Sequence, residues 1–133
     1  MSARTFPVTA RWRFGGSIAM CAIAAAAVAE DDLQALGRLN KEIAQAIGDP
    51  ACGNVAICRV LPIGHDPCGN PSRWVVYNNA PGLKEIVETK GAEITFIEEE
   101  MRRGQTRPKD CAPATKPKLA CVNGRCVLGD TSY

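Results

Sequence analysis

The sequence predicts an α+β protein in which a small antiparallel sheet packs with one or two helices and three disulfides staple the chain. Three observations lead to this prediction. Two long stretches of the 133-residue chain place apolar residues at helical spacing, and two short segments rich in β-branched residues lie between them. Six of the seven cysteines follow residue 30, and the last two flank an Asn-Gly turn.

Residues 1–29 have the composition of a signal peptide. Three arginines and no acidic residue precede the apolar run 14–28. This run is shorter than the roughly 20 residues that span a bilayer, and it closes on the small residues of "AVA", which end at Ala29. We therefore expect cleavage near Ala29, a single periplasmic or secreted domain over 30–133, and no membrane span in the mature protein.

The basic excess of the protein belongs to this predicted leader. The full sequence has 16 Lys and Arg against 14 Asp and Glu, a net charge of +2. The leader holds three of the basic residues and no acid, which leaves 13 basic against 14 acidic residues, a net charge of −1. A balance this close to neutrality gives no reason to expect a nucleic-acid partner or binding to an anionic membrane surface.

Residues 30–48 are predicted to form the N-terminal helix. Acidic residues open this segment, and Gly48 followed by Pro50 closes it, as helix ends prefer. The residues near one helical face are apolar, namely Leu33, Leu36, Leu39, Ile43, Ala46 and Ile47. This face is expected to enter the core of the cysteine-stapled segment 52–133.

Two strands are predicted next, over 53–64 and 73–78. Both segments are short, rich in β-branched residues and bounded by turn formers. The segment 64–72 between them, "GHDPCGNPS", is dense in glycine, proline, asparagine and aspartate and is expected to be an exposed turn. Val60, in the first strand, is expected to be buried.

A long helix is predicted over 79–104, with Asn79 as its N-cap and Gly104 at its end. Its apolar face consists of Leu83, Ile86, Val87, Ile94, Ile97 and Met101. The stretch "GAEITFI", which begins at Gly91, leaves open a break of the helix into a strand.

The last turns of this helix carry two pairs of opposite charge. Glu98 with Arg102, and Glu99 with Arg103, have the i,i+4 spacing of helical ion pairs. We expect these pairs on a solvated face.

Residues 119–129, "LACVNGRCVLG", are predicted to form a terminal hairpin. Asn123 and Gly124 suit a type I′ turn, which needs positive φ at both central positions. In that hairpin Cys121 lies opposite Cys126. The two cysteines could bond to each other, or each could bond to another strand.

The predicted disulfide set is Cys52, Cys58, Cys68, Cys111, Cys121 and Cys126. Six cysteines allow fifteen connectivities. If the two strands are antiparallel and the long helix returns along them, Cys111 arrives near the turn that holds Cys68, so we favour Cys68 with Cys111. That bridge would close a loop of roughly 44 residues, worth about 4 kcal/mol in the chain-entropy model. The other four cysteines would then join the first strand to the terminal hairpin.

His65 is the one histidine of the sequence, and it lies three positions before Cys68. A catalytic Cys–His pair needs an unpaired cysteine, and three bridges would leave none. The cysteine spacings differ from the closely spaced pairs of zinc sites, so we predict no metal site, no cofactor and no catalytic residue. We interpret His65 as a turn residue, with Asp66 bonded to the turn backbone.

The order of these motifs resembles an uncharacterised group of small exported proteobacterial proteins. The shared features are a cysteine pair, a G-x-x-P-C-G-x-P turn, here "GHDPCGNP", an aromatic strand with a tyrosine, and a closing cysteine hairpin, here "CVNGRC". The resemblance covers Cys52 to Val127. It implies envelope export and a disulfide-bonded α+β fold, and it brings no catalytic residue with it.

These features predict a small exported, non-enzymatic domain that binds a protein or an envelope component as a monomer. The candidate binding residues are Arg59, His65, Trp74 and Tyr77. One alternative is a peptidase inhibitor that presents the loop 58–68, because a loop pinned by cysteines and stiffened by prolines is pre-organised for association. The other is an enzyme of unrecognised class, although the three consecutive glutamates 98–100 would point in different directions on a helix.

Overall fold

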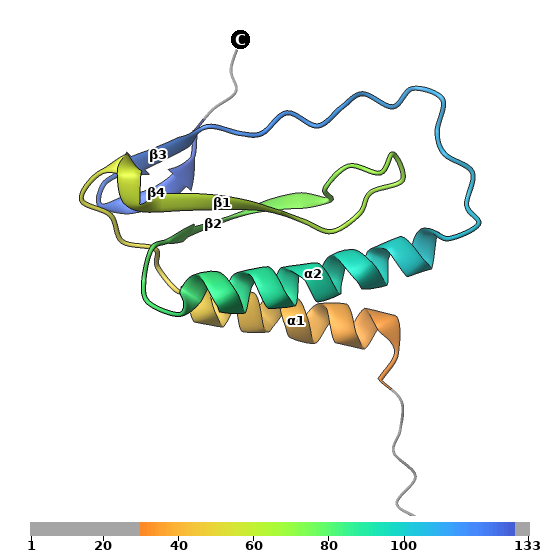
Figure 1. Ribbon diagram of the computed structural model, residues 1–133, viewed down its shortest axis with the longest axis horizontal. Helices are drawn as coiled ribbons and strands as arrows, with labels where there is room; N and C mark the ends of the chain where they lie inside the picture. Colours follow the sequence, from red (N-terminus) through yellow and green to blue (C-terminus); the bar gives the residue numbers. More distant parts are fainter. Residues whose placement is uncertain (1–29, 130–133) are drawn as a thin grey trace, which may run out of the picture.

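The computed structural model describes residues 30–129 (Figure 1). Its elements are, in sequence order, α1 (Asp32–Ile47), the short 3-10 helix η1 (Val55–Ile57), β1 (Cys58–Ile63), β2 (Arg73–Asn78), α2 (Leu83–Arg102), β3 (Leu119–Val122) and β4 (Arg125–Leu128). The predicted signal peptide, with its cleavage site near Ala29, lies outside the described residues.

Two antiparallel β-hairpins and two helices build the fold. β1 pairs with β2, and β3 pairs with β4. Figure 1 shows α1 and α2 side by side along one face of the β1–β2 hairpin, with the β3–β4 hairpin at the end where β1 begins. The predicted α+β class with three disulfides is confirmed. The strands form two separate two-stranded sheets rather than one.

α1 begins and ends where its end signals predict. The side chain of Asp31 accepts a hydrogen bond from the Gln34 N–H at 2.9 Å, and Gly48, with a φ of 55°, follows the last turn. Leu39 and Ile43 are almost fully buried, whereas Leu33 in the first turn is 71% exposed. The apolar face therefore enters the core from the middle turns of the helix.

α2 begins later in the sequence than its predicted N-cap implies. Gly82, in the left-handed conformation with a φ of 76°, is the N-cap, so the assignment of Asn79 was wrong. The reason is local, because Ala80 precedes Pro81 and a residue before proline disfavours helical backbone angles. Ala80 instead donates its N–H to the side chain of Asn78 at 3.1 Å.

α2 then continues without a break through Gly91. This glycine is buried where α2 passes β1, and a Cβ at the position would lie 3.0 Å from Ile63 Cδ1. The absence of a side chain thus allows the helix to approach the strand closely. Neither helix of residues 30–129 combines the length and apolar composition that a membrane span needs.

The core lies between the two helices and the face of the β1–β2 hairpin that they cover. Its buried residues form two clusters, one of Leu39, Ile43, Ile63 and Ile94 and one of Tyr77, Leu83 and Val87. Complete burial of one such aliphatic residue contributes about 1.5 to 3 kcal/mol. Ile86 and Met101, predicted on the same face of α2, are 42% and 40% exposed, because α1 and the hairpin cover a narrower stripe of the helix.

The strands follow the prediction with two corrections. β2 has the predicted bounds, but β1 starts at Cys58, since residues 55–57 form a 3-10 turn. Val60 is half-buried rather than buried. It lies opposite Val76, and alternation places both on the face away from Leu61, which packs on the helical core.

The terminal hairpin has the predicted turn and register. Asn123 and Gly124 have φ values of 51° and 75°, and Cys121 faces Cys126. Each of these cysteines bonds to the first half of the sequence, Cys121 to Cys52 and Cys126 to Cys58. The two bridges anchor the β3–β4 hairpin at the start of β1.

The third bridge joins Cys68, in the loop between β1 and β2, to Cys111 in the segment after α2. Figure 1 shows the geometry that favoured this pair, since α2 runs back along the hairpin and ends near the β1–β2 loop. Three disulfides in a domain of this size fit an oxidising compartment.

We expect the protein to hold no free thiol after the predicted cleavage. The six cysteines of residues 30–129 are all paired, and Cys21 belongs to the predicted leader. A thiol reagent added to the exported protein, denatured but unreduced, should find no reactive cysteine, whereas the reduced sample should show all six. Two or more reactive cysteines per unreduced molecule would contradict the pairing.

Candidate functional site

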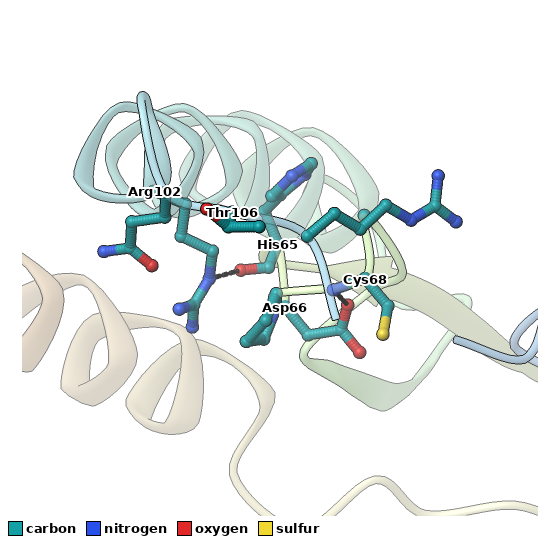
Figure 2. Close-up of a pocket in the computed structure, with 9 residues that line it drawn as sticks. His65, Asp66, Cys68, Arg102 and Thr106 are labelled. Carbon is teal, nitrogen blue, oxygen red and sulfur yellow. Dashed lines mark hydrogen bonds between the residues drawn. The ribbon is translucent and has the colours of Figure 1, made fainter. Parts of the chain in front are cut away.

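A pocket of about 280 Å³ lies between the β1–β2 loop and the C-terminal end of α2 (Figure 2). Residues 65–69 of the loop form one wall. Arg102, in the last turn of α2, and residues 105–107, which follow the helix, form the other. The pocket therefore contains His65, the residue that the sequence singled out in this turn.

α2 holds the loop through the backbone of His65. The His65 N–H donates to Glu98 Oε2 at 2.5 Å, and Arg102 Nε donates to the His65 carbonyl oxygen at 2.6 Å, a bond drawn in Figure 2. Hydrogen bonds with one charged partner are stronger than neutral ones. These two bonds thus attach the loop firmly to the helix.

The ion pairs predicted for these helical turns were wrong. Within residues 30–129, Glu98 and Arg102 form no ion pair with each other because both side chains turn to the loop. Arg103 pairs with Glu100, one position away from the Glu99 that the i,i+4 rule selects.

Asp66 organises the loop from within, as predicted. Its Oδ1 accepts hydrogen bonds from the N–H groups of Cys68 and Asn70, at 2.8 and 2.9 Å. The Asn70 side chain then donates to the Ala112 carbonyl oxygen at 2.8 Å and accepts from the Ala114 N–H at 3.1 Å. The turn predicted to be exposed is therefore only partly so, because it is tied to the segment after α2 beside the Cys68–Cys111 bridge.

Three polar side chains of the pocket make no hydrogen bond within the described part of the protein. They are the imidazole of His65, the hydroxyl of Thr106 and the guanidinium of Arg107. Each can donate a hydrogen bond, and the guanidinium matches the geometry of a carboxylate. No hydrogen bond joins Asp66 to the His65 ring in residues 30–129, so the arrangement differs from a histidine base oriented by a carboxylate.

His65→Ala should change the free energy of unfolding by no more than about 0.5 kcal/mol. The loop uses the backbone N–H and carbonyl of His65, which alanine retains, and substitutions that lose no such anchor have small effects. Urea denaturation of the two proteins, with all bridges intact, measures the difference. A loss above about 1 kcal/mol would show that the ring itself supports the loop.

The other predicted binding residues lie elsewhere. Arg59 and Tyr77 face each other across β1 and β2 and line a second pocket, beside the N-terminal end of α2. Trp74 is half-buried opposite Pro62 and borders a shallow depression next to α1. The structure therefore brings Arg59 and Tyr77 together and separates them from His65 and Trp74.

The cysteines also form a compact sulfur cluster. The Sγ atoms of Cys52, Cys58 and Cys126 lie within 4.8 Å of one another because two bridges run side by side. Metal ligation requires thiolates, and these sulfurs are bonded in disulfides. The expectation of no metal site stays a prediction.

Four residues that line the first pocket or hold its loop in place were not predicted from the sequence. Glu98 and Arg102 anchor the loop, and Thr106 and Arg107 complete the far wall. Helical spacing predicts neighbours along one helix and says nothing about a loop that the helix passes. The useful signal was the favoured Cys68–Cys111 pair, which places this end of the helix beside the loop.

Comparison with known proteins assigns no function to either pocket. No protein-family model, curated protein or solved structure matches the sequence. The resemblance to small exported proteobacterial proteins stays a prediction.

Proposed function

We propose that the protein is an exported, non-enzymatic binding domain that presents the β1–β2 loop and the adjoining residues 105–107 to a protein or envelope partner. The observation that carries the proposal is the attachment of this loop. The loop is attached at three residues, through the Cys68–Cys111 bridge, the two bonds to the His65 backbone and the bonds of the Asn70 side chain. Its tip at Pro67 and Gly69 is exposed.

Rigid attachment favours binding because a pre-ordered loop loses little conformational entropy on association. The donors of the unbonded side chains, on His65, Thr106 and Arg107, suit a carbonyl or carboxylate group of the partner. Arg107 is exposed, and an exposed charge at a binding rim also speeds association with an acidic surface.

Export is part of this proposal. Three disulfides fit an oxidising compartment, and the predicted signal peptide would deliver the protein to the periplasm or beyond. Cleavage near Ala29 would leave the described domain intact, since the first helical cap is Asp31. N-terminal sequencing of the exported protein tests the cleavage site.

The peptidase-inhibitor alternative needs a correction to its loop. Residues 58–63 form β1, paired along its length with β2, so this half of the predicted 58–68 segment is not a presented loop. Residues 64–72, which connect the two strands, are the part of this segment outside the strand pairing. An inhibitory function would have to use that shorter loop.

Site-specific photo-crosslinking tests the proposed binding surface. A photoreactive residue at Thr106 of the full-length protein, expressed in its host, should give one discrete adduct in the exported fraction. The same residue at Gln45, exposed on α1, should not give that adduct. Arg107→Glu should abolish the adduct, whereas Lys116→Glu, an exposed change of equal charge in the same segment, should leave it.

The outcomes separate the hypotheses. Loss of the adduct with Arg107→Glu alone supports the loop surface, and identification of the partner as a peptidase would favour the inhibitor. No adduct, or an adduct of equal yield from Thr106 and Gln45, would contradict the proposal. Thermal melts of all variants check that the fold is retained.

A further inference from the structure

α2 begins after β2, at the end of the helix opposite the β1–β2 loop (Figure 1). The second pocket, of about 290 Å³, lies at this start of α2. Arg59 of β1, Tyr77 of β2 and the first residues of α2 line it. It shares no residue with the pocket at the β1–β2 loop.

The first turn of α2 leaves backbone donors open at this pocket. The N-cap Gly82 has no side chain to accept from them, and the Leu83 N–H reaches the Ala80 carbonyl oxygen at 3.2 Å. Within residues 30–129, the N–H groups of Lys84 and Glu85 have no hydrogen-bond acceptor. An uncapped N-terminus of a 20-residue helix attracts a negative group through these N–H groups and the helix dipole.

Tyr77 supplies a second and independent observation. The residue is 4% exposed, its ring packs with Leu83 and Val87, and its hydroxyl has no hydrogen-bond partner in the described residues. The single fully buried polar side-chain atom without a partner in this part of the protein is Asn40 Oδ1. The Tyr77 hydroxyl is therefore not sealed in the core, and Tyr77 is one of the residues that line the pocket.

The Tyr77 hydroxyl is available as a donor. Burial, and next the carboxylate of Glu88, raise the pKa of Tyr77 above its ordinary value, so the phenol stays protonated at neutral pH. Tyrosine is expected to find a polar partner when its ring is buried, and the described residues provide none here.

Arg59 adds a fixed positive charge. Its Nη1 donates to the carbonyl oxygens of Ala56 and Cys58 at 2.7 and 2.8 Å, which holds the guanidinium at the pocket beside Tyr77. A guanidinium held in place loses less entropy when it binds an anion.

The other charges at this end of the helix are one lysine and two glutamates, a net charge of −1. Lys84 pairs with Glu88 at 2.8 Å. Glu85 lines the pocket as well, and its exposed carboxylate opposes an incoming anion through solvent-screened repulsion. Glu85 therefore weakens the attraction of the pocket for an anion without removing the donors of Arg59, Tyr77 and the helix start.

We propose that the pocket formed by Arg59, Tyr77 and the uncapped start of α2 binds a carboxylate group of a polypeptide. The carboxylate would accept from the N–H groups of Lys84 and Glu85, from the Tyr77 hydroxyl and from the Arg59 guanidinium. A volume of about 290 Å³ holds a carboxylate with one small residue attached. The same chemistry occurs at the C-terminus of a polypeptide and on an Asp or Glu side chain.

Titration of the ¹⁵N-labelled, disulfide-bonded protein with sodium acetate tests the site. The amide signals of Lys84 and Glu85 should move downfield in a saturable manner. Acetamide, which has the same shape without the charge, should leave them in place. Shifts no larger than those caused by equal sodium chloride would overturn the proposal.

Variants identify the donors. Tyr77→Phe, which keeps the ring in the core, should weaken acetate binding about fivefold, and Arg59→Gln about tenfold. Glu85→Gln should tighten binding about twofold, because it removes the opposing charge. Arg73→Gln, at the other end of the same hairpin, is the matched control and should not change the affinity. Unchanged binding in Tyr77→Phe would overturn the proposal even if Arg59→Gln failed to fold.

Three acetylated tripeptides distinguish the source of the carboxylate. The first ends in a free carboxylate, the second is its amide, and the third is an amide with one glutamate side chain. Binding of the first alone assigns the site to a polypeptide C-terminus, and binding of the third alone assigns it to an acidic side chain. Binding of both assigns it to the carboxylate in either setting, and binding of neither overturns the proposal.

Discussion

Replacing both Cys68 and Cys111 by alanine is expected to lower the free energy of unfolding by about 4 kcal/mol. The bridge closes a loop with a sequence separation of 43 residues, and the chain-entropy model gives this value for a loop of that size. A domain of this length is stable by only about 5 to 15 kcal/mol, so the loss is a large fraction of the total. Guanidinium denaturation of the oxidised proteins measures the difference.

Removal of Cys52 and Cys121 provides the matched control. This bridge has a longer separation of 69 residues, yet Cys58–Cys126 still joins the same two segments after its loss. While Cys58–Cys126 is in place, the Cys52–Cys121 bridge closes only a short ring of the chain. The same model gives about 3 kcal/mol for the removal of Cys52–Cys121. A larger loss from the Cys52 and Cys121 pair than from the Cys68 and Cys111 pair would contradict this account of adjacent bridges.

Gly64→Ala is expected to lower the free energy of unfolding by about 3 kcal/mol. Gly64 is buried with a φ of 84°, a conformation that costs an L side chain about 1 to 2 kcal/mol. An added Cβ would also overlap Ser72 Oγ and Glu98 Oε2. Displacement of the carboxylate breaks its charged hydrogen bond to the His65 N–H, worth about 1.5 to 3 kcal/mol.

Gly69→Ala separates the two contributions. Gly69 has nearly the same φ, 81°, but a Cβ there would meet only His65 Cε1, at 3.9 Å. This variant should therefore lose only the backbone contribution, about 1 to 2 kcal/mol. Chemical denaturation of both variants checks the difference, and equal losses would show that the overlap at Gly64 relaxes without cost.

Photo-crosslinking at Thr106 should also decline in Gly64→Ala, because the loop loses its attachment to α2.

The elements with strong local signals were predictable because their signals act over a few residues. α1 follows from Asp31, Gly48 and the apolar spacing between them, and the terminal hairpin follows from the positive φ that Asn123 and Gly124 tolerate. The start of α2 was predictable in principle as well. Pro81 restricts Ala80, a local effect that outweighs the capping preference of Asn79.

The candidate sites were predictable only in part. His65, Arg59 and Tyr77 were selected from the sequence, and each lines a pocket. Their polar neighbours were not selected, because Glu98 and Arg102 contact a loop more than 30 residues away in the sequence. Helical spacing predicted that those two side chains pair with each other. The packing of α2 against the loop shows instead that both bond to the His65 backbone.

The sequence by itself determined the α+β class, the position of α1, the bounds of β2, the register of the β3–β4 hairpin and the set of paired cysteines. Periodicity, turn chemistry and cysteine number specify these features locally. Tertiary structure alone decided that Gly91 lies against Ile63 inside an unbroken helix and that the start of α2 meets Arg59 and Tyr77. These contacts join separate segments, and their geometry depends on how closely the helices approach the hairpin, which no local pattern encodes.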